Sequence, residues 1–182
     1  MLLNLPYRKR RVFVALYYSQ GLASNPRANA RDHTRFHWAI WVEPRGSKGE
    51  GACYQVLYPD RYLNGSHSGE WLFNYQANAD YTRSHTMLGR IMVGKLPPRI
   101  SLDDVRMILT RLPLPVRDSP IDTCDSWAFR ALEELQKYGC VDDFDVPGFM
   151  DHAHAKASEW CRLGGYPAVN KKENYRPDRK FP

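Results

Sequence analysis

Cysteine is scarce in this sequence of 182 residues, and its four cysteines stand far apart, at positions 53, 124, 140 and 161. The chain therefore lacks the CxxC pairs from which zinc frameworks are built, and we expect neither a metal site nor a cofactor. A domain of this size can bury a sufficient core without disulfides or metals. Each cysteine is thus either a packing residue or a nucleophile.

Long hydrophobic runs and internal repeats are also missing. The apolar run "VFVAL" at 12–16 is too short to cross a bilayer. In "MLLNLPYRKRR" the apolar residues precede the charges, the reverse of a signal peptide. We therefore expect a cytoplasmic protein with reduced thiols and no membrane span.

Negative charge is sparse at both ends of the chain. The segment "RKRR" at 8–11 carries +4, and 170–182 carries +3, from five basic and two acidic residues. Because the whole chain carries +6, the body between them is near −1. Such basic ends are typical of solvated termini, so nucleic-acid binding is not expected in spite of a pI of about 9.2.

Alternating β-branched and aromatic residues predict strands at 11–19, 36–44, 52–59 and 86–96, with a possible strand inside 69–76. Apolar residues at helical spacing predict helices at 101–112, from 122 or 123 to 138, and 149–163. Ser101 and Asp104 fit a capping box, either Asp122 or Thr123 can cap the second helix, and Gly139 can end it.

These elements predict a single α+β domain at 11–165, in which an antiparallel sheet packs against about three helices. A basic arm at 1–10 precedes the domain, and a basic, flexible tail at 166–182 follows it.

Cys124 opens the predicted helix in "SPIDTCDSWAFRALEEL", residues 119–135. The positive end of a helix dipole stabilises a thiolate, so a low pKa is expected if this cysteine is a nucleophile. The free amides at such a helix start can also hold an oxyanion. The alternative is that Cys124 is a small buried residue, as free cysteines often are, and packing is the favoured interpretation of the other three cysteines.

A nucleophilic cysteine needs a base, which is usually histidine. The six histidines are at 33, 37, 67, 85, 152 and 154. His37 differs from the others because it starts the apolar run "HWAIWV" on a strand, and the alternative is that it is only a packed or hydrogen-bonded residue there. His152 and His154 would point to different faces of a helix and are not expected to bind a metal.

The order of a His-led strand, a second strand and a Cys at a helix start resembles the circularly permuted papain-like cysteine proteins. These include the lecithin retinol acyltransferase group, the permuted NlpC-type peptidases and the PPPDE-like proteases. Their His-x-Gly/Ala strand is matched by "HWAIWV", and their Asn-Cys-x-x-Phe/Trp helix by "TCDSWAF". The resemblance covers about residues 12–138, and the chain is also similar to a set of small uncharacterised fungal proteins with an "HWA" strand and a "CxxW" helix.

The resemblance implies a permuted papain-like fold in which Cys124 is the nucleophile and His37 the general base. The acyltransferase group has a second His at the position that corresponds to Gln55, and the Gln side chain can accept the imidazole N–H. The sequence does not fix the register of the hairpin, so it leaves open whether Gln55 faces His37 or points away from it. Thr123 stands where Asn is frequent. Backbone amides near Cys124 and Asp125 would hold the oxyanion.

Candidate substrate-binding residues are Trp38, Trp41 and Arg35. Most aromatic side chains of the sheet region are expected in the core: these are Trp38, Trp41, Tyr54, Tyr58, Trp71 and Tyr75. The loop at 20–35 holds Arg27, Arg31, His33 and Arg35, which either bind a substrate anion or form a solvated loop.

The sequence therefore predicts a cysteine hydrolase or acyltransferase that acts on a small-molecule or peptide acyl substrate. A catalytically silent binding or accessory module of the same fold is one alternative, and an RNA-associated protein is another. The sequence indicates no particular oligomeric state.

Overall fold

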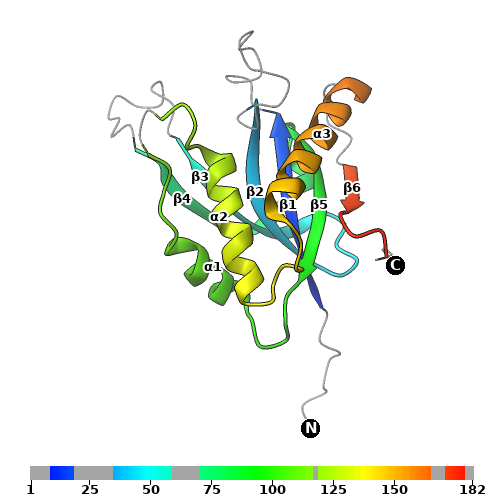
Figure 1. Ribbon diagram of the computed structural model, residues 1–182. Helices are drawn as coiled ribbons and strands as arrows, with labels where there is room; N and C mark the ends of the chain where they lie inside the picture. Colours follow the sequence, from blue (N-terminus) through cyan, green and yellow to red (C-terminus); the bar gives the residue numbers. More distant parts are fainter. Residues whose placement is uncertain (1–8, 19–34, 59–69, 117–118, 165–170, 179–182) are drawn as a thin grey trace.

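One sheet of six strands has three helices on one face (Figure 1). The computed structural model describes residues 9–18, 35–58, 70–116, 119–164 and 171–178. The strands are β1 Arg10–Tyr18, β2 Phe36–Pro44, β3 Glu50–Leu57, β4 Leu72–Asp80, β5 Met87–Lys95 and β6 Lys171–Asn174. The helices are α1 Leu102–Thr110, α2 Cys124–Lys137 and α3 Val146–Gly164, with a 3-10 turn, η2, at Tyr81–Arg83.

The sheet order is β4-β3-β2-β1-β5-β6. Neighbouring strands are antiparallel except β5 and β6, which are parallel. The predicted α+β class is confirmed, but the sheet is mixed and not purely antiparallel. None of the helices in the described part of the chain is long and apolar enough to cross a membrane.

The strands at 11–19, 36–44, 52–59 and 86–96 and all three helices are confirmed within a few residues, and the possible strand in 69–76 is real and runs on to Asp80. Ser101 caps α1 through a capping box with Asp104, and Thr123 is the N-cap of α2. Gly139 ends α2 with a positive φ of 69°, the left-handed conformation that favours glycine.

The segment 166–182 was predicted to be a flexible tail, but its residues 171–174 form β6 beside β5. Side chains of this segment contact distant parts of the fold. The Nζ atom of Lys172 lies 2.6 Å from Oε1 of the buried Glu43, and the Tyr175 ring packs edge-on to Phe149 at 4.9 Å. The four residues of β6, "KKEN", are all polar and show no apolar alternation, so the sequence does not predict a strand there. The residues that stabilise this strand are far away in the sequence.

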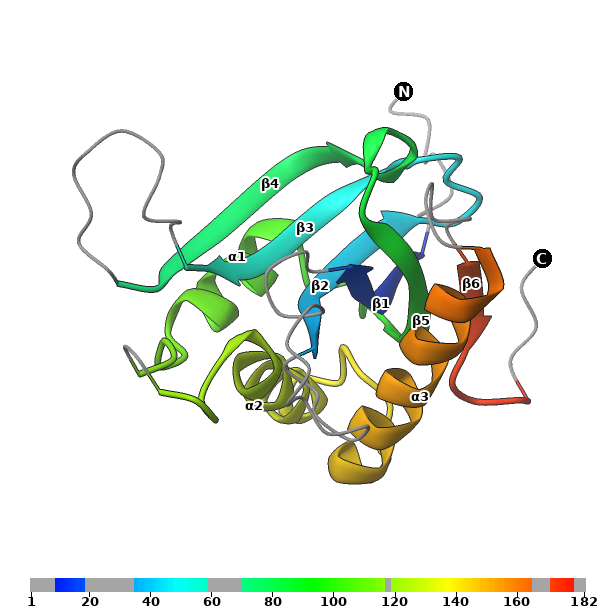
Figure 2. The same cartoon turned by 90° about the horizontal axis from the view of Figure 1, so that it is seen from above.

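The larger core lies between the sheet and the helices. Alternate residues of the central strands face α2 and α3, among them Val14 of β1 and Trp38 and Ile40 of β2. Trp127 of α2 and Phe149 of α3 meet them and are fully buried. Figure 2 shows the three helices together below the sheet.

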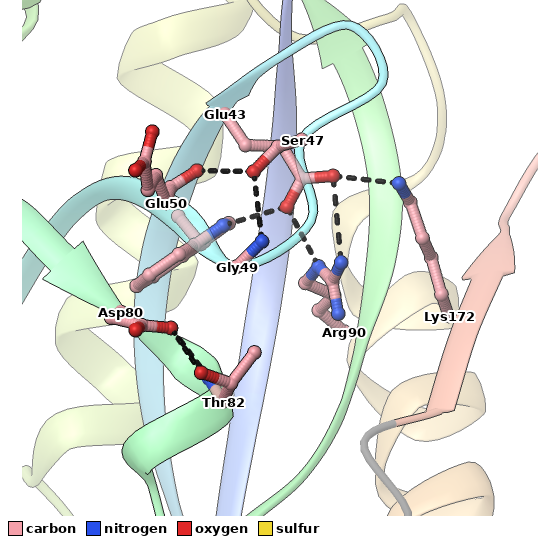
Figure 3. A network of polar contacts seen from close by, with 9 residues as sticks. Glu43, Ser47, Gly49, Glu50, Asp80, Thr82, Arg90 and Lys172 are labelled. Atoms are coloured by element: carbon pink, nitrogen blue, oxygen red, sulfur yellow. Dashed lines mark hydrogen bonds and ion pairs between the residues drawn. The ribbon is translucent and has the colours of Figure 1, made fainter.

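The opposite face holds a smaller core around a buried ion cluster (Figure 3). The carboxylate of Glu43, at the end of β2, lies 2.9 Å from Nε of Arg90 and also accepts from Trp41 Nε1 at 2.9 Å. The Arg90 guanidinium lies 3.9 Å from the ring centroid of Tyr81 in η2. The connection from β4 to β5 therefore covers part of this face.

Gly51 in β3 passes directly under the indole of Trp41. A Cβ atom at position 51 would lie 2.5 Å from two carbons of that ring. We expect Gly51→Ala to lower the free energy of unfolding by about 1–3 kcal/mol, because the buried indole must shift. Urea unfolding measures this, with Asn78→Ala at an exposed position of β4 as the control. Equal stability of the two variants would contradict the close packing.

Candidate active site

Cys124 is the first residue of α2, and it lies against the beginning of β2. The thiol donates to the backbone carbonyl of Phe36, with Sγ and O 3.7 Å apart. The backbone amide of Trp38 also lies within hydrogen-bond reach of the sulfur. In an extended strand these two groups point to the same edge, so the sulfur lies beside the main chain of residue 37.

This position is open because β3 does not pair with the start of β2. The register of these two strands runs only from Ala39 opposite Gln55 to Val42 opposite Ala52. The other edge of β2 remains paired, with His37 opposite Tyr17 of β1. The beginning of α2 therefore takes the place of a neighbouring strand at this edge.

His37 and Gln55 are brought together by the hairpin. Nε2 of the imidazole lies 2.8 Å from Oε1 of Gln55. The sequence left open whether Gln55 faces His37, and in the structure it does. The imidazole also contacts the ring of Tyr17, at 5.6 Å between centroids, on the sheet face away from the helices.

The thiol and the imidazole are neighbours but are not hydrogen-bonded to each other in the described part of the chain. The reason is strand geometry: the ring of His37 projects to the face of Tyr17 and Ala39, whereas the Cys124 side chain belongs to the core on the helix side. The peptide of residue 37 lies between the two groups.

Burial keeps both groups neutral. It raises the pKa of the Cys124 thiol to about 12, and the nearby Asp125 carboxylate adds to this effect, while the amide of Trp38 opposes it. Burial also lowers the pKa of His37, which the Gln55 hydrogen bond partly offsets. The low thiol pKa expected from the helix dipole is therefore wrong for this structure, because the thiol is only 3% exposed.

Two of the three expected substrate-binding residues are buried packing residues. Trp38 and Trp41 are 0% and 1% exposed and lie in the two opposite cores, so both are packing residues. The guanidinium of Arg35 lies 5.8 Å from the ring of Phe36. The loop residues Arg27, Arg31 and His33 lie outside the described residues.

The sequence did not single out His154 as a site residue. It is 5% exposed on α3, and its ring lies 5.4 Å from that of Phe36, whose carbonyl accepts the thiol. Met150, His154 and Ala157 are spaced so that they share one face of a helix, and this spacing could have predicted that His154 faces the core.

A hollow of about 490 Å³ lies between the beginnings of α2 and α3. Asp125, the residue after Cys124, lines it together with Phe129 and Met150. Its volume is in the range of small-molecule sites. In the described residues no group of three or more His, Cys, Asp and Glu side chains is arranged to hold a metal ion.

These features define an α+β protein in which a helix-start cysteine lies beside a His–Gln pair. The chain belongs to a family of unknown function, DUF6914, whose family model matches residues 9–161. No curated protein and no solved structure matches the chain. The matched region contains Cys124, His37 and Gln55.

Proposed function

We propose that the protein is a cysteine-dependent hydrolase or acyltransferase that acts on an amide or ester through an acyl-thioester. The observation that carries the proposal is the convergence of three residues from distant parts of the chain. The sulfur of Cys124 lies at the main chain of His37, and Gln55 binds the far nitrogen of that imidazole. A nucleophile, a base and a group that orients the base are the parts of such a site.

The neutral resting state determines the order of events. With a thiol and an imidazole in place of a thiolate and an imidazolium, the proton must leave sulfur as the sulfur attacks. The imidazole of His37 takes that proton once the separation of the two groups by the residue-37 peptide has closed, and it then passes the proton to the departing amine or alcohol. The acyl group stays on Cys124 as a thioester, and the amides of Cys124 and Asp125 hold the oxyanion.

The second half of the reaction returns the enzyme to its starting state. His37 takes a proton from water, or from an amine or alcohol acceptor, which attacks the thioester carbon. The thiolate leaves and regains the proton from His37. Water gives hydrolysis and another acceptor gives acyl transfer.

Trapping of the acyl-enzyme tests this proposal. The protein is incubated with p-nitrophenyl esters of short and long fatty acids and of N-acetylated amino acids, and is then digested and analysed by mass spectrometry. We expect an acyl adduct on Cys124 that is lost in Cys124→Ala and formed at least tenfold more slowly in His37→Ala.

The part-exposed Cys161 is the internal control for chemical acylation, because no His–Gln pair lies beside it among the described residues. An adduct that accumulates equally on Cys161 and Cys124, or fails to form on Cys124 with every ester, would contradict the proposal.

A catalytically silent binding or accessory module is the second candidate. The observation that favours it is that the thiol donates to a carbonyl and not to the imidazole, while only 3% of Cys124 is exposed. In that case Cys124→Ser would bind the same ligands as the native protein, and no acyl adduct would form.

A further inference from the structure

A chain of side-chain hydrogen bonds runs across three strands on the face that carries His37. Oε1 of Gln55 lies 2.8 Å from Nε2 of His37, and Nε2 of Gln55 donates to Oδ1 of Asn74 at 3.2 Å. Asn74 stands directly opposite Gln55 in the β3–β4 ladder. Both hydrogen bonds are therefore made by residues of regular strands, whose positions the ladder fixes.

The amide of Gln55 connects the two ends of this chain. The NH₂ group of a side-chain amide only donates hydrogen bonds, and its oxygen only accepts them. Once one partner binds the NH₂ group, the second partner must therefore bind the oxygen. With Asn74 accepting from the Gln55 NH₂ group, the Gln55 oxygen must face the imidazole. That oxygen needs a donor, and Nε2 of His37 must carry the proton.

The remaining imidazole nitrogen, Nδ1, is then the basic one. Reversal of this state requires the amides of Gln55 and Asn74 to flip together, because two carbonyl oxygens or two NH₂ groups cannot bond each other. A residue on the edge strand therefore influences which nitrogen of a histidine two strands away can accept a proton.

We infer that Asn74 is a positioning residue that holds the Gln55 amide in one orientation and so keeps His37 in the Nε2–H tautomer, with Nδ1 free to act as the base. The base role rests on the proposed function, whereas the tautomer does not. The two statements can thus be tested separately.

Nitrogen-15 NMR of the imidazole at pH 7.5 reads the tautomer directly. The low pKa of His37 keeps the ring neutral under these conditions. We expect the native spectrum to show a protonated Nε2 and an unprotonated Nδ1. In Asn74→Ala the two shifts should move toward each other, as the Gln55 amide samples both orientations. His37→Gln identifies the signals.

Asn74→Asp is the matched variant, because an aspartate has only acceptors for the Gln55 NH₂ group. It should keep the native tautomer, although Asn74→Ala loses it. A native spectrum with the proton on Nδ1, or an unchanged tautomer in Asn74→Ala, would overturn the inference. Because no substrate is needed, the spectrum stays informative if the ester experiment finds no acyl-enzyme.

Discussion

At pH 7, Cys124 of the native protein should react with iodoacetamide about a thousand times more slowly than an unperturbed cysteine. Only the thiolate reacts, and burial raises the pKa of Cys124 from an ordinary value of 9.0 to about 12. A pKa that is three units higher makes the thiolate fraction roughly 10³-fold smaller at any pH well below both pKa values. The rate should rise about tenfold per pH unit and show no plateau below pH 10.

Peptide mapping by mass spectrometry after timed alkylation measures this rate, with Cys161 as the part-exposed internal control. In concentrated guanidinium chloride the rates at the two positions should converge, because both thiols of the unfolded chain then have the ordinary pKa of cysteine. A rate for Cys124 that exceeds that of Cys161 at pH 6 would show a resting thiolate–imidazolium pair. It would contradict the neutral pair on which the proposed order of proton transfer depends.

Glu43→Ala should cost about 3–5 kcal/mol of unfolding free energy, the largest effect that we expect from a single substitution in this chain. Glu43 is 0% exposed and Arg90 is 2% exposed, and their charged groups are 2.9 Å apart. Removal of the carboxylate leaves the guanidinium buried without its counter-charge and takes away an acceptor from Trp41. Urea unfolding followed by tryptophan fluorescence measures the loss.

Two variants distinguish the cost of an uncompensated buried charge from the cost of losing an ion pair. Glu134→Ala breaks an exposed pair with Lys137 and should change stability by less than about 0.5 kcal/mol. Glu43→Leu combined with Arg90→Met removes both buried charges and should recover most of the stability. A Glu43→Ala protein as stable as Glu134→Ala would show that the cluster is hydrated.

The fold was predictable where its signals are local. Alternation in β1 and β2, the capping box at Ser101 and the glycine after α2 are each contained in a few consecutive residues. β6 was not predictable, since its four polar residues become a strand only beside β5 and under the attraction of Glu43. Long-range partners override local propensity in such segments.

The candidate site was predictable in its members but not in its electrostatics. The His-led strand and the helix-start cysteine are sequence features, and the hairpin brings Gln55 to His37. The pKa of Cys124 depends on how tightly the helix start is packed, and no sequence pattern reports that. The role of Asn74 follows from the strand register alone, which turn and bulge geometry decide.

The ion cluster also has a consequence for the newly made chain. Glu43 and Lys172 are 129 positions apart in sequence, so a ribosome must add most of the chain between the synthesis of one partner and that of the other. At about 5–20 residues per second this interval lasts roughly 6–26 s. Within this interval, from the completion of β5 at Lys95 until β6 is made, the outer edge of β5 has no β6 to pair with. The interval is when we expect the nascent chain to depend most on chaperones.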